Sequence, residues 1–366
     1  MSQSVKFFKT KLHYAVWLLM LLLSYFIYED YGIAWDEPEQ REIGLTTYNY
    51  LNDNGVDLQT YRNRSYGIVI ELPLIYIEKA LHLNNPSEIF KIRHLVLHLL
   101  FLIGVFIFYK LNYLLFGKRV LAFLAMLLLY FTPAVFGHSF INSKDIPLMV
   151  FFIFGLYALL LFVIKPTKKN VFILAAIIGL TMGIRIIGLL MFGISTLFFI
   201  QLFINKKYHR QIVVSRFLLF VFISFLVFYG VSPSMWLHPF SYVKDTFLRM
   251  SHFPWNYQTL YLGKMVYARD LPWHYVFGWI FLTLPLLHLF FYLAGLYSTY
   301  YFAIKNPIKF LKSIRLFFIA IAADIPILTV LLLIINGSTL YDAWRHVFFF
   351  IPFHAFNSSF WIKKNP

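Results

Sequence analysis

The sequence predicts an all-α protein whose helices form a transmembrane bundle of about ten spans. Hydrophobic residues make up 60% of the 366 residues, only 13% are charged, and the mean hydropathy is +0.70. Such values exclude a soluble globular domain, so the bilayer must be the solvent for most of the chain. There is no cysteine, which excludes disulfides, zinc–thiolate sites and thiol nucleophiles.

A membrane-spanning helix needs roughly 17–25 apolar residues. Runs of that kind cover residues 12–28, 92–109, 119–136, 146–164, 216–232, 275–303, 316–335 and 346–362. Bulky residues follow the first run where a signal peptide would have small ones, so we expect a retained helix. The stretch 171–204 is too long for one untilted helix and short for two. We expect residues 1–366 to form a single integral membrane domain.

The net charge is +16, and its distribution along the chain predicts the topology. With a cytoplasmic N-terminus, the inner loops hold more than half of the 32 Lys and Arg residues and no Asp or Glu. All acidic residues except Asp324 then lie in outer segments. Because both loops flanking 171–204 are basic, this stretch must cross twice, as two short helices joined near Arg185. We therefore expect a multi-pass protein of the plasma (inner) membrane with both termini cytoplasmic and no nucleic-acid partner.

The outer segments hold most of the polar residues. The first outer loop, 29–91, carries the acidic stretch YGIAWDEPEQREIG, and a second large outer loop covers 233–274. Short outer loops are expected at 137–145 and 336–345. The segment 67–81 is too short to span, so we expect it to form a helix on the outer surface.

Carboxylates and cations of separate segments converge on this outer face, and they form the candidate site. Such a set suits a reaction in which a nucleophile is deprotonated and an anionic leaving group is stabilised. The predicted catalytic residues are Asp36, Glu37 and Asp145. The predicted residues for binding substrate or phosphate are Arg41, Lys144, Arg185, Tyr341, Arg345 and His346.

Structural roles are open for several of these residues. Asp36, before Pro38, and Asp145 have the residue type and position of helix N-caps. Arg345 and His346 could anchor a helix at the lipid headgroups. Arg185 is harder to explain structurally, because an arginine in an apolar run is costly and usually marks a site. His94 and His98 have ligand spacing but no acid nearby in sequence, so we expect hydrogen-bonded helix residues. For Asp324, a proton relay and a partner for a buried base both stay open.

Four features together resemble the GT-C superfamily of membrane glycosyltransferases. They are the Asp-Glu pair after the first helix, the stretch KDIPLMVFFIFGLYALLLF, the basic hairpin GLTMGIRIIGLL, and the late WRHVFFFIP. The likeness is greatest to glycosyltransferase family 39, the group of dolichyl-phosphate-mannose–protein mannosyltransferases and aminoarabinose-lipid A transferases. It runs from about residue 12 to residue 352. Arg41 lies farther from the acid than the corresponding arginine of the lipid A enzymes, and the chain ends without a soluble outer domain.

The resemblance implies a GT-C-like fold and an inverting hexosyl or pentosyl transferase active at the outer face. Its partners would be a polyprenyl-phosphate-linked sugar, a glycan, lipid or protein acceptor, and membrane lipid. It implies Asp36 as the base, Asp145 as a supporting acid, and Arg185, Arg345 and Arg41 as phosphate ligands. Because a phosphate leaves as an anion near neutral pH, a single carboxylate suffices, unlike in a glycoside hydrolase.

Three alternatives accompany this prediction. No cofactor is certain, and a divalent metal held by Asp145, Glu37 and His138 is an open alternative that we do not expect to be essential. The rival function is a multi-span transporter or lipid flippase with Arg185 and Asp324 as coupling residues, although the chain lacks the internal repeats common in transporters. A non-catalytic subunit of an envelope-assembly complex is the third.

Overall fold

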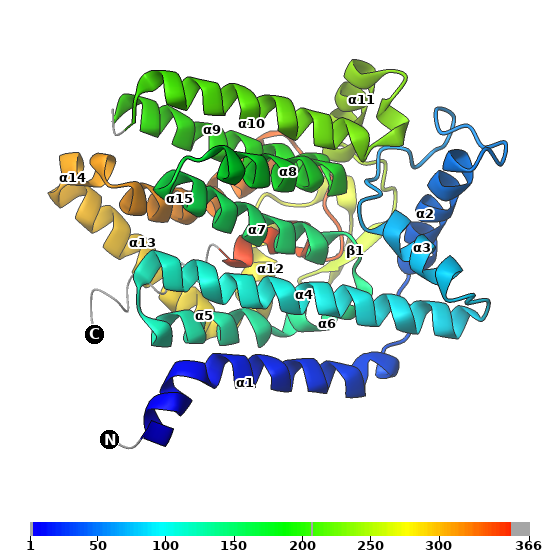
Figure 1. Cartoon of the computed structure of the whole chain (residues 1–366). Helices are drawn as coiled ribbons and strands as arrows, with labels where there is room; N and C mark the ends of the chain where they lie inside the picture. The colour runs from blue at the N-terminus through cyan, green and yellow to red at the C-terminus, as the bar shows by residue number, and fades with distance from the viewer. Residues whose placement is uncertain (1–2, 206–207, 353–366) are drawn as a thin grey trace.

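A computed structural model describes residues 3–205 and 208–352 (Figure 1). The α-helices are α1 (Gln3–Ile27), α2 (Glu37–Leu51), α3 (Glu71–Ala80), α4 (Pro86–Phe116), α5 (Arg119–Tyr130), α6 (Pro133–Ile141), α7 (Asp145–Ile164), α8 (Lys168–Ile184), α9 (Leu189–Ile204), α10 (Arg210–Gly230), α11 (Pro239–Ser251), α12 (Tyr275–Thr283), α13 (Leu286–Lys305), α14 (Pro307–Lys312) and α15 (Ile314–Ile335). The 3-10 helices are η1 (Tyr28–Asp30), η2 (Ile186–Gly188), η3 (Pro233–Met235), η4 (Ala268–Asp270) and η5 (Arg345–Phe350), and the strands are β1 (Gln258–Tyr261) and β2 (Lys264–Tyr267).

The helices confirm a polytopic, all-α membrane protein. Within the described residues, 6 helical segments are long and apolar enough to cross a membrane, and counting two bent pairs as spans gives up to 8. The bent pairs are α5 with α6, at 62°, and α12 with α13, at 118°. The predicted last span, 346–362, lies mostly beyond residue 352, and its described part begins as the buried 3-10 helix η5. The total of ten spans stays a prediction.

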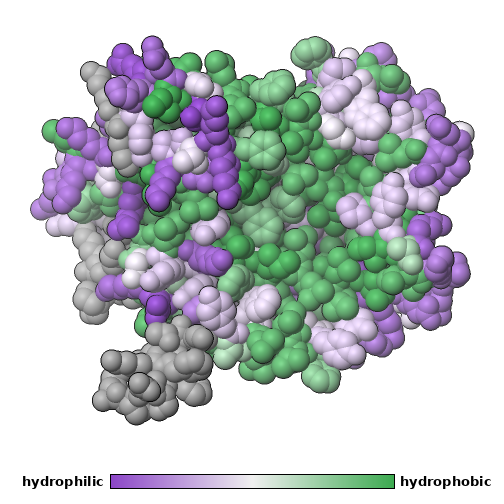
Figure 2. All heavy atoms as spheres, in the orientation of Figure 1, coloured by the Kyte–Doolittle hydropathy of each residue, from purple (hydrophilic) through white to green (hydrophobic). Residues whose placement is uncertain are grey.

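The surface has the polarity of a membrane protein. Figure 2 shows hydrophobic side chains across the middle of one face and hydrophilic side chains gathered at its two ends. In the same orientation, α2 and α3 lie at one of these ends and α14 at the other (Figure 1). This pattern fits a protein whose apolar middle faces the lipid and whose two polar ends face water, because polar groups avoid hydrocarbon.

The centre of the bundle consists of α4, α7, α8 and α10, each packed on the next. Large aromatic side chains within it, including Phe101, Phe108, Phe152 and Phe162, are fully buried. Local signals set the ends of α4: the Asn85 side chain accepts a hydrogen bond from a first-turn amide, and a left-handed glycine follows the last residue. This rigid centre holds the start of α7 against η5, and both of these elements contribute to the site.

The stretch 171–204 forms two helices, α8 and α9, separated by a break at Arg185, as predicted. Residues 29–91, for which we keep the name first outer loop from the predicted topology, carry two helices, α2 and α3, which pack on each other. The second of them is shorter than the predicted 67–81. The second outer segment holds features that the sequence did not predict: helix α11 and an antiparallel hairpin in which Gln258 pairs with Tyr267.

Candidate active site

Asp36 precedes the first residue of α2 but does not cap that helix, because its side chain makes no capping hydrogen bond. Its Oδ2 instead accepts hydrogen bonds from Lys144 Nζ at 3.2 Å and pairs with Arg345 Nη2 at 2.9 Å. The capping interpretation of Asp36 is therefore wrong. Two cations from distant parts of the chain converge on one carboxylate oxygen.

Asp145 does not cap its helix either, although it opens α7. The neighbouring Asn142 takes the capping role: its side-chain oxygen accepts from the backbone N–H groups of Lys144 at 3.1 Å and of Asp145 at 2.8 Å. The Asp145 carboxylate is thereby left for other partners. It accepts from Asn142 Nδ2 at 3.0 Å and forms an ion pair with Arg185, and its side chain is only 3% exposed.

Arg185 lies in extended backbone at the break between α8 and η2. The first outer loop presses directly on this break. A side chain at Gly67 would overlap with the carbonyl oxygens of Gly183 and Ile184, and one at Gly188 would meet the backbone of α8. Glycine at these close approaches lets the outer loop cover the hairpin that holds the arginine.

The C-terminal contribution comes from a tight bend before η5. Asp342 and Ala343 both have left-handed backbone, with φ of 52° and 60°. Such conformations are costly for residues with a side chain and persist where the surroundings impose them. After this bend, Arg345 reaches back to Asp342 at 2.8 Å as well as to Asp36.

The ion pairs of Asp36 and those of Asp145 form one cluster with balanced charge, because Lys144 and Arg345, which bind Asp36, also act electrostatically on Asp145. Its members are Asp36, Asp145, Asp342, Lys144, Arg185 and Arg345, three carboxylates and three cations. Tyr66 closes one side, with its ring 5.4 Å from Lys144 Nζ. Tyr341 stacks on Trp255 with ring centroids 4.4 Å apart and meets His346 edge-on at 4.6 Å.

Burial and the neighbouring charges shift the pKa values of Asp36 and Lys144 in opposite directions. Burial raises the pKa of Asp36, but Lys144 and Arg345 outweigh it and hold that pKa below its usual value. Burial lowers the pKa of Lys144, although Asp36 and Asp145 oppose this. Burial also lowers the pKa of His346 to about 3, so its imidazole is neutral near pH 7. The buried His346 Nδ1 has no hydrogen-bond partner among the described residues.

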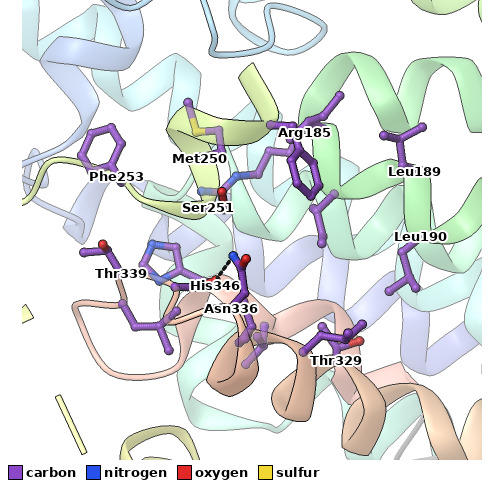
Figure 3. Close-up of a pocket in the computed structure, with 18 of the residues that line it drawn as sticks. Arg185, Leu189, Leu190, Met250, Ser251, Phe253, Thr329, Asn336, Thr339 and His346 are labelled. Carbon is purple, nitrogen blue, oxygen red and sulfur yellow. Dashed lines mark hydrogen bonds between the residues drawn. The ribbon is translucent and has the colours of Figure 1, made fainter. Parts of the chain in front are cut away.

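A cavity of about 520 Å³ extends from this cluster into the apolar part of the bundle. Arg185, His346, Tyr341 and Tyr66 contribute its polar lining. The remaining wall is largely apolar, and Figure 3 shows Leu189 and Leu190 on one side. Thr329 of α15 and Asn336, which follows that helix, add polar groups to the lining. The apolar lining also includes Phe247, Met250, Phe253, Leu332, Leu333, Leu340 and Phe349. An amphipathic ligand with an anionic head fits such a chamber.

Two predicted site residues lie elsewhere. Glu37 is buried, accepts from the Ala34 amide at 2.7 Å, and binds His94 Nε2 at 3.0 Å. This pair ties the loop before Asp36 to α4, and it gives His94 the acid that the sequence seemed to lack. Arg41 binds Glu78 at 2.9 Å on α3, in a different ion network.

The proposed metal ligands do not form a site. The part of the chain that the structure describes has no group of three His, Cys, Asp or Glu residues arranged to hold a metal. Glu37 is taken by His94, and Asp145 is held by Arg185. The residues therefore do not fit the Asp145–Glu37–His138 set, and no step is derived through a metal.

The structure also adds residues that the sequence did not single out. Tyr66 and Trp255 come from segments distant in sequence from their partners Lys144 and Tyr341, whereas Asp342 pairs with Arg345 only three residues later. The transporter alternative needs Arg185 and Asp324 to act together, but they have different partners. Asp324 accepts a hydrogen bond from Tyr300, whereas Arg185 binds Asp145.

Comparison with known families now bears on this site. Residues 85–236 match the family described as dolichyl-phosphate-mannose-protein mannosyltransferase. The predicted resemblance to a GT-C membrane glycosyltransferase is confirmed. The matched segment, less than half of the chain, contains Lys144, Asp145 and Arg185. No curated protein matches the chain, and no solved structure does. The match supports a glycosyltransferase of GT-C type that uses a polyprenyl-phosphate sugar.

Proposed function

We propose that the protein transfers a sugar from a polyprenyl phosphate to an acceptor at the outer face of the plasma membrane, with Asp36 as the base. Both termini are cytoplasmic in this proposal, and the acceptor is a glycan, lipid or protein. The observation that carries the proposal is the contact between the charge-balanced ion cluster and a largely apolar cavity, whose wall includes Arg185 of the cluster together with Tyr66 and Tyr341 beside it. The family match to residues 85–236 supports the same donor class.

The donor has an anionic head and an apolar tail, and the cavity has a polar end and an apolar wall to match them. Its phosphate lies against Arg185 and Arg345, which bind phosphate through charge-assisted hydrogen bonds. His346, neutral and with an unpartnered Nδ1, supplies a further contact at the same end. The first isoprene units lie along Leu189, Leu190, Leu332 and Leu333, where the cavity wall is apolar. The tail then continues into the lipid.

Donor binding also changes the state of the base. Before it binds, Asp36 is paired with Lys144 and Arg345, and a carboxylate in that setting is a poor proton acceptor. The donor phosphodiester brings one negative charge to a cluster whose charges already balance. It competes with Asp36 for Arg345, so the carboxylate loses part of its stabilisation and its pKa rises. The base is thus activated when the donor is in place.

The chemical step then needs no general acid. Asp36 accepts the proton of the acceptor hydroxyl while that oxygen attacks the anomeric carbon. The bond from this carbon to the phosphate oxygen breaks on the opposite face, which inverts the configuration. The polyprenyl phosphate leaves with the electron pair of that bond, and Arg185 and Arg345 stabilise its added charge. The proton on Asp36 later passes to water.

The test is sugar transfer by the full chain in liposomes, with labelled polyprenyl-phosphate mannose as donor and a cell-envelope extract as acceptor. We expect the wild type to release polyprenyl phosphate. Asp36→Asn keeps the side-chain shape and removes the base, so turnover should fall by about 10²–10⁴. Binding of the labelled donor should persist, because the cations remain.

Asp270→Asn is the matched control, because Asp270 is an exposed outer-segment carboxylate paired only loosely with Arg269 at 3.5 Å. It should retain full activity. Equal turnover by Asp36→Asn and wild type would remove Asp36 as the base. Failure of the wild type to bind or turn over any of a panel of polyprenyl-phosphate sugars would overturn the proposed function itself.

A further inference from the structure

A second cavity lies outside the ion cluster, between the first outer loop and α11. Its volume is about 260 Å³, and it is lined by Gln59, Arg64, Ser234, His238, Ser241 and Tyr242. Every one of these residues has a side chain that donates or accepts hydrogen bonds. We call it the outer polar pocket. Its lining contrasts with the apolar wall of the donor cavity.

The geometry points to the outer polar pocket as the binding site of a saccharide acceptor, an inference that rests on the proposed function. Sugars present many hydroxyl groups and little apolar surface, so a wall made of hydrogen-bonding side chains suits them. The Arg64 side chain is 32% exposed, and its Nη2 reaches Asp245 only at 3.5 Å. Its Nη1 donates to the Gln59 carbonyl oxygen at 2.6 Å, which holds the guanidinium at the pocket, and the loose surface pair leaves Nη2 to bind a ligand.

One face of α11 lines this pocket. His238, Ser241 and Tyr242 are spaced so that they fall on the same side of the helix, and Asp245 lies one turn further along. His238 and Ser241 are exposed, as are Leu237, Phe240 and Leu248, whereas Tyr242 is buried. Across the pocket, Gln59 of the first outer loop closes it by a hydrogen bond to the Ser234 carbonyl at 3.2 Å.

The same loop connects the pocket to the reacting groups. Arg64 lines the outer polar pocket, while Ser65 and Tyr66 line the donor cavity. Residues 64 and 66 are at most about 7 Å apart along the chain. Tyr66 faces Lys144, the ligand of Asp36, and Asn63 binds Glu39 of α2 at 2.9 Å. An acceptor held in the pocket therefore lies beside the base without occupying the place of the donor.

The experiment measures binding and transfer separately, with the full chain in nanodiscs. The probes are a set of defined oligosaccharides, with a serine- and threonine-containing peptide as the competing class. We expect at least one oligosaccharide to bind and to accept sugar. Arg64→Ala should weaken that binding by about 10- to 100-fold, because it removes a charged hydrogen-bond donor. Tyr242→Phe should weaken it by about two- to tenfold.

Two controls keep a folding defect apart from loss of a binding site. Ser241→Trp fills the pocket from an exposed position, so it should block saccharide binding without disturbing the core. Arg269→Ala removes an exposed arginine of the same outer segment and should change nothing. Slow release of polyprenyl phosphate to water, without acceptor, should be equal in Arg269→Ala and the wild type, and thermal unfolding in the nanodisc reports whether each pocket variant is folded.

The outcomes separate this inference from the proposed function. If the donor turns over but no saccharide binds, or if only the peptide binds, the saccharide pocket is wrong and the transferase stands. The inference also falls if Arg64→Ala and Ser241→Trp leave the KM for the saccharide unchanged. If the donor itself is never bound, the proposed function fails first.

Discussion

Two ion networks lie among the described residues near α2 and α3, and one of them contributes to the wall of the donor cavity. The first is the ion cluster around Asp36 and Asp145, which faces the donor cavity. The second links Arg93 of α4 to Glu71 and Glu78 of α3, with Arg41 of α2 at its edge. Both mix arginines with carboxylates from segments far apart in sequence.

The difference between the networks is access. Arg93 is 1% exposed, and its two partners are 2% and 3% exposed, so a substrate cannot reach them. They hold two surface helices on the bundle. In the ion cluster, Lys144, Arg345 and Asp36 keep 14%, 12% and 23% of their side chains exposed. Charge and burial alone therefore do not identify a site, whereas charge at the wall of a cavity does.

The largest expected effect falls on the Arg93 network and on stability alone. Arg93→Ala leaves the buried Glu71 without a cation and Glu78 with Arg41 alone, which should cost about 3–5 kcal/mol of unfolding free energy. Activity per folded molecule should stay unchanged. Thermal unfolding in detergent, followed by tryptophan fluorescence, and sugar transfer by the folded fraction measure the two quantities.

A matched variant sharpens this prediction. Arg93→Met combined with Glu71→Gln and Glu78→Gln removes all the buried charges together, and stability should recover most of the loss. A large drop in the transfer rate of folded Arg93→Ala protein would mean that the two networks are coupled, and the comparison would fail.

The second effect is the converse, a loss of activity without a loss of fold. Arg185→Gln alone would leave Asp145 buried and unpaired, so it is combined with Asp145→Asn, which removes both charges of the pair. We expect this double variant to unfold near the wild-type temperature. Its rate of sugar transfer should fall by about 10²–10³, because one contact to the leaving phosphate is gone. A double variant with normal turnover would assign the Asp145–Arg185 pair to structure, like the Arg93 network.

The sequence predicted the parts of the site that follow from topology. Charge placed Asp36, Lys144, Asp145 and Arg345 on one side of the membrane, and an arginine within an apolar run marked the hairpin at Arg185. The structure brings these five residues together. To group these residues it was enough to know which side of the membrane each loop faces, and a single sequence predicts that.

Side-chain pairing could not be predicted in the same way. Glu37 and His94 are 57 residues apart, and only the packing of the loop on α4 brings them into contact. Asn142 and Asp145 are equally suitable N-caps by residue type. In the structure Asn142 accepts the backbone hydrogen bond, while the Asp145 carboxylate pairs with Arg185. Asp342 enters the cluster through a left-handed bend that has no glycine to signal it.

Arg41 was predicted to belong to the ion cluster but lies in the Arg93 network. Its substitution should have the smallest effect on stability and activity. It was predicted as a phosphate ligand because it follows the Asp-Glu pair, yet it lies at the edge of the second network with 28% of its side chain exposed. Since Glu78 keeps its bond to Arg93 at 2.9 Å, Arg41→Ala should cost less than about 1 kcal/mol. Its KM for the donor should equal that of the wild type, measured beside Arg345→Ala as the variant that does lose a phosphate ligand. A donor KM raised as much as in Arg345→Ala would place Arg41 in the site, and burial would then not separate the two networks.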